Sequence, residues 1–118
     1  MRNGQILIAE DDPVLQRLYR DYLADCLPDH ARVGVYGTDC PEEARRWIEQ
    51  EEGLVLLDGS VFRRMGIELG QLPGRVIVCS GDEDLVEDAL RAGLRAFCKG
   101  KGDLSALSAL IQEVRKAA

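Results

Sequence analysis

The sequence lacks the ligand spacing of a zinc site. It contains one histidine, His30, and four cysteines, none of which forms a Cys-x-x-Cys pair. Zinc in proteins is held mainly by cysteine and histidine at short, regular spacings. We therefore expect four reduced cysteines that behave mostly as small buried apolar side chains, with His30 exposed in a polar connection.

The sequence also lacks an excess of positive charge and any long apolar run. It carries 21 acidic against 15 basic residues, a net charge of −6, whereas nonspecific nucleic-acid binding needs a basic face that neutralises phosphates. No apolar run approaches the roughly 20 residues that span a bilayer. The opening MRNGQILIAEDD is not a signal peptide, because acidic residues follow its apolar stretch directly. We expect a cytoplasmic protein with no nucleic-acid or membrane partner.

What the sequence does contain fits one domain over residues 1–118. Apolar residues make up 46% and charged residues 31%, which is typical of a globular chain with one core. Short apolar segments predict strands at 6–9, 31–37, 54–58, 75–81 and 94–99. Helical periodicity predicts helices at 12–27, 38–53, 82–93 and 103–117, with at most a short helix around 65–72. This alternation predicts an α/β fold, a parallel sheet with helices on both faces.

The first predicted helix has the clearest signals. Asp12 can cap it, and Pro13 suits its first position. The apolar residues that follow at three- and four-residue spacing should form one apolar face: Val14, Leu15, Leu18, Tyr19, Tyr22, Leu23 and Leu27.

Three acidic residues, Glu10, Asp11 and Asp12, directly follow the first predicted strand. At about 4 Å, two like charges repel by roughly 1 kcal/mol in water and about 4 kcal/mol at an effective dielectric near 20. Such a cluster indicates a bound cation. Ligands of parallel sheets bind at the carboxyl ends of the strands, and the third and fourth predicted strands end there in Asp58 and Ser80.

The chemistry at this edge favours Mg²⁺ and a phosphoryl group. Carboxylates without histidine or cysteine suit a hard cation with oxygen ligands. A cation, a hydroxyl and a lysine together can bind a phosphoryl group. An aspartate beside the ion can itself be the nucleophile and form an aspartyl phosphate.

On these residues the sequence resembles a response-regulator receiver domain, the phosphoacceptor module of two-component signalling. The resemblance rests on ILIAEDDP at the first strand end, LVLLDGS and MGIEL around the third, VIVCSG at the fourth and AG with AFCK at the fifth. It covers the whole chain and implies the flavodoxin-like (βα)₅ fold of the chemotaxis receiver, with strand order 2-1-3-4-5. The segment from Asp58 to Ser80 is several residues shorter than usual, so the third helix should be shortened.

The resemblance assigns a role to each site residue. Glu10 and Asp11 take the positions of the acidic pair, with Asp11 the more direct Mg²⁺ ligand. Asp58 takes the phosphoacceptor position and is also a metal ligand, and the backbone carbonyl of Ser60 is the third protein ligand. Ser80 takes the position of the switch hydroxyl that bonds a phosphoryl oxygen. Asp12 is then mainly a helix cap.

The position of the phosphate-contacting lysine is open between two residues. Family spacing from Gly93 and Phe97, which lies near the aromatic position that reorients with the switch, falls on Gly100. Lys99 and Lys101 flank it. We favour Lys99, because a one-residue deletion before the fifth strand would align it, and we keep Lys101 as the alternative.

The resemblance implies a phosphoacceptor that signals by conformational change and is not a dedicated enzyme. It would receive its phosphoryl group from a sensor histidine kinase or a phosphotransfer protein, lose it by autodephosphorylation, and act on a downstream protein target. A homodimer through the fourth helix, fifth strand and fifth helix is a further partner that it allows.

Other interpretations remain open from the sequence. The main alternative is a degenerate receiver that binds proteins independently of phosphorylation. The simplest alternative is an α/β domain whose acidic strand ends are solvated and have no role in binding. A phosphohydrolase with an aspartate nucleophile is disfavoured because no second carboxylate stands two residues after Asp58. A flavin-binding protein is disfavoured because Glu10 and Asp11 would repel the cofactor phosphate.

Overall fold

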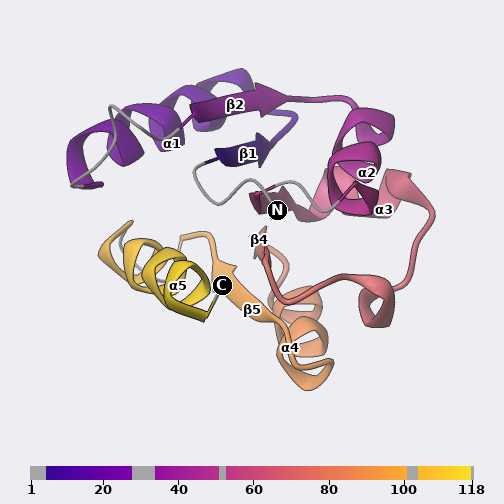
Figure 1. The fold of residues 1–118 in the computed structure, drawn as a ribbon. Coiled ribbons are helices and arrows are strands. Elements are labelled where there is room, and N and C mark those ends of the chain that lie inside the picture. The colour runs from indigo at the N-terminus through magenta and orange to yellow at the C-terminus, as the bar shows by residue number, and fades with distance from the viewer. Residues whose placement is uncertain (1–4, 28–33, 51–52, 101–103, 118) are drawn as a thin grey trace.

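The apolar segments form a parallel sheet of five strands in the order β2-β1-β3-β4-β5 (Figure 1). The structure, a computed structural model, describes residues 5–27, 34–50, 53–100 and 104–117. Its strands are β1 (Gln5–Ala9), β2 (Gly34–Thr38), β3 (Leu54–Asp58), β4 (Val76–Ser80) and β5 (Arg95–Cys98). The predicted strand order is thus confirmed. His30, residues 31–33 of the second predicted strand, and Lys101 lie outside the described residues.

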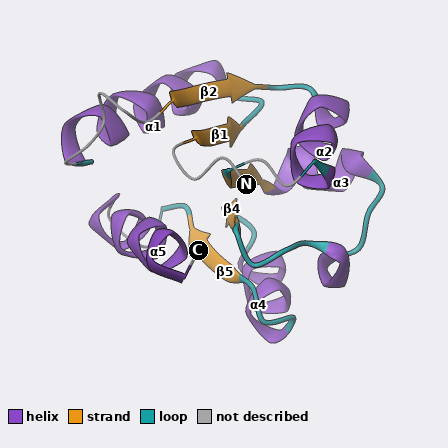
Figure 2. Ribbon diagram, in the orientation of Figure 1, coloured by secondary structure: helices purple, strands orange, loops and turns teal. Residues whose placement is uncertain are grey.

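Helices cover both faces of the sheet, as Figures 1 and 2 show. The helices α1 (Pro13–Cys26) and α5 (Leu104–Ala117) lie on one face, and α2 (Pro41–Glu49), α3 (Gly59–Met65) and α4 (Glu83–Arg91) lie on the other. Successive residues of a strand point to opposite faces, so alternate residues of β1 and β3 pack against different helices. The central strands are buried throughout because both faces are covered.

The third helix is short, as predicted, but its predicted position was wrong. We expected it around 65–72, whereas α3 spans Gly59–Met65 and is followed by a 3₁₀ turn at Leu69–Gln71. The helix begins directly after β3 because the Asp58 side chain caps its first turn. It ends at Gly66, whose φ of 71° lies in the left-handed region that glycine adopts readily.

Helix α1 begins as predicted, but part of its apolar face is exposed. Asp12 Oδ1 accepts hydrogen bonds from the backbone N–H groups of Val14 and Leu15. Tyr19 and Leu23 are buried against the sheet, whereas Val14 is 73% and Leu18 47% exposed. The apolar face of α1 is therefore wider than the part of the helix that packs against the sheet.

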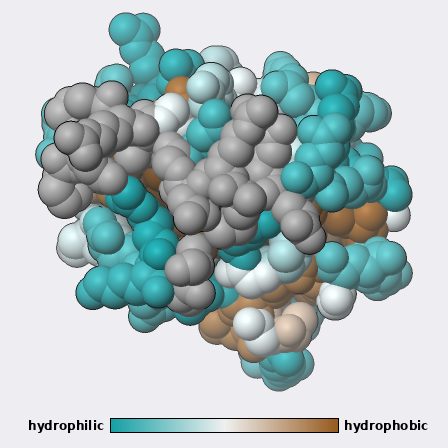
Figure 3. Space-filling view, in the orientation of Figure 1, coloured by the Kyte–Doolittle hydropathy of each residue, from teal (hydrophilic) through white to brown (hydrophobic). Residues whose placement is uncertain are grey.

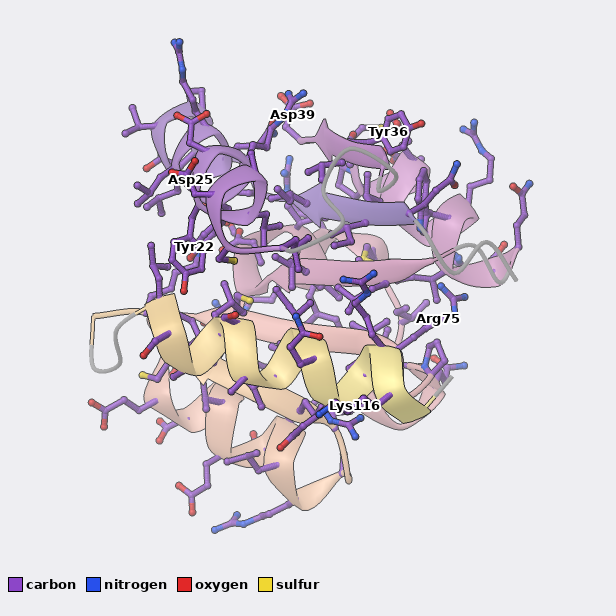
Figure 4. All side chains as sticks on the ribbon, turned by 60° about the vertical axis from the view of Figure 1, so that its left-hand side comes forward. Tyr22, Asp25, Tyr36, Asp39, Arg75 and Lys116 are labelled. Carbon is purple, nitrogen blue, oxygen red and sulfur yellow. The ribbon has the colours of Figure 1, made fainter. Side chains whose placement is uncertain are left out.

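The surface of the molecule is mostly hydrophilic in the view of Figure 3. Hydrophobic side chains gather on that face over α4, which carries the exposed Leu90. Side chains project from every element in the rotated view of Figure 4, where α5 crosses the front. No helix in the described part of the chain combines the length and apolar character needed to cross a bilayer. All four cysteines are free, and Cys79 is buried in β4.

Candidate metal and phosphoryl site

Three carboxylates meet at the carboxyl ends of β1 and β3. These strands are hydrogen-bonded neighbours, with Ala9 opposite Leu57, so the residues that follow them, Glu10 and Asp58, lie side by side. One oxygen from each of Glu10, Asp11 and Asp58 lies within 4.8 Å of the others. Glu10 and Asp58 are 2% and 6% exposed, while Asp11 is exposed at the rim. The structure thus brings together the three carboxylates that the sequence singled out.

The donor set suits Mg²⁺. This ion prefers oxygen ligands at about 2.0–2.1 Å, so oxygens on opposite sides of it lie about 4.2 Å apart. Three carboxylate oxygens that all lie within 4.8 Å of one another are close enough to bind one such ion once their side chains adjust. Among the described residues this cluster contains no histidine or cysteine, which would favour zinc instead.

Lys99 lies between two of these carboxylates. Its Nζ is 2.5 Å from Asp58 Oδ1 and 2.8 Å from Glu10 Oε2. The backbone N–H of Lys99 donates to the carbonyl of Ser80, which extends the β4–β5 pairing by one residue and fixes where the side chain begins. From the sequence we expected carboxylates that repel one another until a cation binds, but the ammonium group of Lys99 already offsets part of that repulsion.

Asp58 also serves as the N-cap of α3. Its Oδ2 accepts hydrogen bonds from the N–H groups of Ser60, at 3.1 Å, and Val61, at 3.4 Å. We expected the Ser60 carbonyl as a metal ligand, but Ser60 lies in the first turn of a helix. Helical carbonyls point toward the C-terminal end and accept a bond from four residues on. The structure therefore places this carbonyl in the first turn of α3, and its role as a metal ligand stays a prediction.

Ser80 closes the site from β4, and a glycine makes room for it. The Ser80 side chain is buried, and its Oγ accepts a hydrogen bond from the Asp82 N–H at 3.0 Å. A Cβ on Gly59 would lie 2.8 Å from this Oγ, so only glycine lets the first turn of α3 approach Ser80 this closely. Sequence reasoning missed Gly59, although a glycine directly after the phosphoacceptor position was a readable signal. Phe97, in β5, is buried in the same hydrophobic cluster as Cys79 and Ile111.

Solved receiver structures match nearly the whole chain. The signal receiver domain of a protein described as a Luxo repressor from Vibrio parahaemolyticus is 20% identical with a TM-score of 0.69, over 99% of this chain and 92% of that chain. A LuxR family DNA-binding response regulator from Silicibacter pomeroyi is 19% identical with a TM-score of 0.67, over 97% and 93%. The BeF3-activated N-terminal receiver domain of Klebsiella pneumoniae RstA is 21% identical with a TM-score of 0.66, over 95% and 98%.

The chain has the receiver-domain fold. At these identities the likeness concerns the fold, and the site has to be argued from its own residues. No protein-family model and no curated protein matches the sequence. In this receiver fold the three carboxylates and Lys99 occupy the edge of the sheet where the strands end.

Burial and Lys99 act in opposite directions on the pKa values of the site. Burial raises the pKa of Glu10 from 4.5 to about 7, although the hydrogen bond and charge of Lys99 act to lower it. Burial also acts to raise the pKa of Asp58, but the hydrogen bond and charge of Lys99 outweigh it and bring that pKa below its ordinary value. The two carboxylates in turn hold the pKa of Lys99 above its ordinary value despite its burial. At neutral pH, Asp58 is therefore ionised while Glu10 is still partly protonated.

We expect the affinity for Mg²⁺ to rise with pH up to about pH 7. Because the pKa of Glu10 is raised from 4.5 to about 7, this carboxyl must lose a proton before it can bind the ion. Affinity should then fall by up to about tenfold for each pH unit below 7. In metal-free protein, folding stability should change with pH in the opposite direction to Mg²⁺ affinity. The raised pKa of Glu10 means that protonated Glu10 stabilises the fold below its unfolded pKa, and this stability is lost as the pH rises through about 7.

Calorimetric titration with MgCl₂ between about pH 5.5 and about pH 7.5, in buffers of different ionisation enthalpy, measures both the affinity and the proton released. Glu10→Gln is the matched control. It should bind more weakly and lose most of the pH dependence in this range. An affinity of wild-type protein that does not change with pH would contradict the role given to Glu10.

Proposed function

We propose that this chain is a phosphoacceptor of two-component signalling, phosphorylated on Asp58 with Mg²⁺ and acting on a protein partner through a conformational change. The observation that carries this proposal is the convergence of Glu10, Asp11, Asp58 and Lys99 at one edge of the sheet. Mg²⁺ would be held by Glu10, Asp11 and Asp58. The carbonyl of Ser60, in the first turn of α3, is the further ligand that we propose.

The residues of the site suit transfer of a phosphoryl group. A carboxylate oxygen of Asp58 attacks phosphorus, an O–P bond forms, and the bond from phosphorus to the donor atom breaks with its electron pair leaving on the donor. The lowered pKa of Asp58 keeps this nucleophile ionised at neutral pH. Mg²⁺, when bound, would offset the charge of the phosphoryl oxygens. Lys99 adds a second positive charge 2.5 Å from Asp58.

Ser80 is the group we propose to bond the phosphoryl group after transfer. Its hydroxyl lies against the first turn of α3, where Gly59 leaves room for it. In the present arrangement its Oγ accepts from the Asp82 N–H, and a hydroxyl can still donate its own hydrogen. Donation to a phosphoryl oxygen would pull this residue, and the chain between β4 and α4, toward Asp58.

The partners proposed for this role are a sensor histidine kinase or a phosphotransfer protein as donor, and a downstream protein as target. A cytoplasmic location accords with both. A homodimer through α4, β5 and α5 stays a prediction, as does the assignment of residues 1–118 to one receiver domain.

A docking module that works without phosphorylation is the second candidate. The observation that favours it is the start of α3 at Gly59, because this start engages Asp58 Oδ2 as a helix cap and keeps the Ser60 carbonyl in the helix. In that case the carboxylate site would no longer accept a phosphoryl group, and the domain would bind its partner in the unphosphorylated state alone.

Incubation with a small phosphodonor separates the two candidates. We expect wild-type protein with Mg²⁺ to gain the mass of one phosphoryl group, and to gain little in EDTA, because the ion is needed to offset charge during transfer. Intact-protein mass spectrometry measures both, with a phosphorylated histidine kinase as a second donor. Absence of any mass gain with every donor, in protein shown to be folded by circular dichroism, would favour the docking module.

A further inference from the structure

Two helix caps flank the carboxylate site, and one ion pair connects them. Asp58 caps α3 through Oδ2. Asp82 caps α4 through Oδ1, which accepts from the N–H groups of Asp84 at 3.0 Å and Leu85 at 3.4 Å. The other carboxylate oxygen of Asp82, Oδ2, accepts a hydrogen bond from Arg63 on α3. The cap of one helix is thus joined to the body of the other.

A change at Asp58 would act directly on the helix that carries Arg63. A phosphoryl group on Asp58 turns its carboxylate into an acyl phosphate, in which the acyl end is uncharged and the phosphoryl group is a bulky anion. The acyl group that then faces the first turn of α3 is uncharged, so it accepts hydrogen bonds from the N–H groups of that turn more weakly. A weakened cap destabilises or shifts the end of a helix. Because α3 has only seven residues, Arg63 lies little more than one turn from the disturbed cap, close enough for a shift of that turn to reach it.

Ser80 gives the same region a second connection. Its Oγ accepts from the Asp82 N–H, so a Ser80 hydroxyl drawn toward a phosphoryl group would also pull on Asp82. Arg63 holds the side-chain carboxylate of the same residue, Asp82. The first turn of α4 is therefore held by two groups, and both respond to the state of Asp58.

We propose that the ion pair between Arg63 and Asp82 transmits the phosphorylation state of Asp58 from α3 to the first turn of α4. Arg63 is then a positioning residue for signalling, and it does not contact the reacting atoms. The inference rests on the proposed phosphoacceptor function, and it names the connection within this chain that carries the signal.

The exposure of the pair suits it to a switching role. The side chains of Arg63 and Asp82 are 54% and 42% exposed, and an exposed ion pair shifts an equilibrium by at most about fivefold. This is too little to decide whether the chain folds, and enough to bias two arrangements of one loop. Replacement of Arg63 should therefore leave a folded protein.

The test uses beryllofluoride, a phosphoryl mimic, on the full chain with Mg²⁺. Fluorine NMR reports whether it binds, and hydrogen exchange of the Asp84 and Leu85 amides reports the first turn of α4. We expect beryllofluoride to change this exchange in wild-type protein. In Arg63→Gln it should still bind, but the response at α4 should shrink, by up to about fivefold.

Two further variants distinguish transmission from a structural role. Asp82→Asn keeps a capping oxygen and removes the charge, so it should shrink the response as much as Arg63→Gln, and the double variant should add nothing further. Arg64→Gln is the matched control, because Arg64 is the next residue of α3 and contacts the Asp39 carbonyl instead. It should respond like wild type.

An undiminished response in Arg63→Gln that binds beryllofluoride would overturn the inference and leave the phosphoacceptor function standing. Equal losses in Arg63→Gln and Arg64→Gln would also overturn it, since the charge of α3 and not the pair would then matter. Wild-type protein that binds no beryllofluoride would overturn the inference together with the proposed function.

Discussion

Asp58→Asn should take up no phosphoryl group under conditions that label the wild-type protein fully. The amide lacks the anionic oxygen that attacks phosphorus. Among the described residues, Glu10 and Asp58 are the two buried carboxylates within hydrogen-bond reach of Lys99. The product expected in wild type is an acyl phosphate, so hydroxylamine should remove the label, whereas it would not remove a phosphate from serine. Intact mass and peptide mapping before and after hydroxylamine measure both expectations.

Asp12→Asn is the matched control for the loss of an acidic group. Asp12 belongs to the same acidic run, but its side chain caps α1, and asparagine caps a helix about as well as aspartate. This variant should be labelled like wild type. Label that persists in Asp58→Asn, or that resists hydroxylamine, would remove Asp58 from the phosphoacceptor role.

Lys99→Ala should have the largest effect on stability in the absence of metal. It leaves Glu10 and Asp58 buried beside each other without the ammonium group that lies 2.8 Å from one and 2.5 Å from the other. Removal of one partner from a buried ion pair typically costs about 3–5 kcal/mol, and Lys99 is 18% exposed, so we expect about 3 kcal/mol. Urea unfolding in EDTA measures this loss.

Mg²⁺ should restore much of the stability of Lys99→Ala, because the ion replaces the missing positive charge and its carboxylate ligands are intact. Phosphorylation, or the response to it, should stay impaired, because the contact of Lys99 with the phosphoryl group is gone. Lys101→Ala should be near neutral in both measurements. A Lys99→Ala protein as stable as wild type in EDTA, or loss of function in Lys101→Ala instead, would move the role away from Lys99.

The sheet and the carboxylate cluster could be predicted because both follow from short-range sequence patterns. Continuous apolar runs such as LVLLD indicate strands buried on two faces, and the strand order followed from the resemblance. Parallel strands all end at one edge, so acidic residues after β1 and at the end of β3 had to meet if those strands were neighbours. Glu10, Asp11 and Asp58 met for this reason.

The start of α3 could not be placed because Asp58 has two roles. The sequence pattern indicates Asp58 as a site carboxylate and gives no separate sign that it caps a helix, although α3 begins directly after it at Gly59, six residues before the predicted start. Similarly, the choice between Lys99 and Lys101 depends on where the β4–β5 ladder ends, which is set by the bond from the Lys99 N–H to the Ser80 carbonyl. The contact of Arg63 with Asp82 joins exposed residues 19 positions apart, and a local sequence pattern cannot predict such a pair.

The double use that we propose for Asp58, as nucleophile and helix cap, would link group-transfer potential to helix stability. A capping carboxylate stabilises its helix by about 1 kcal/mol, and phosphorylation would give up part of that contribution because the same carboxylate becomes an uncharged acyl group in a mixed anhydride. Part of the free energy released when the acyl phosphate is hydrolysed would then come from restoring the cap of α3. Linkage is reciprocal for binding free energies. A donor protein that binds the chain with the first turn of α3 already open would therefore favour phosphoryl transfer by the same free energy, and a target that closes this turn would favour the unphosphorylated chain.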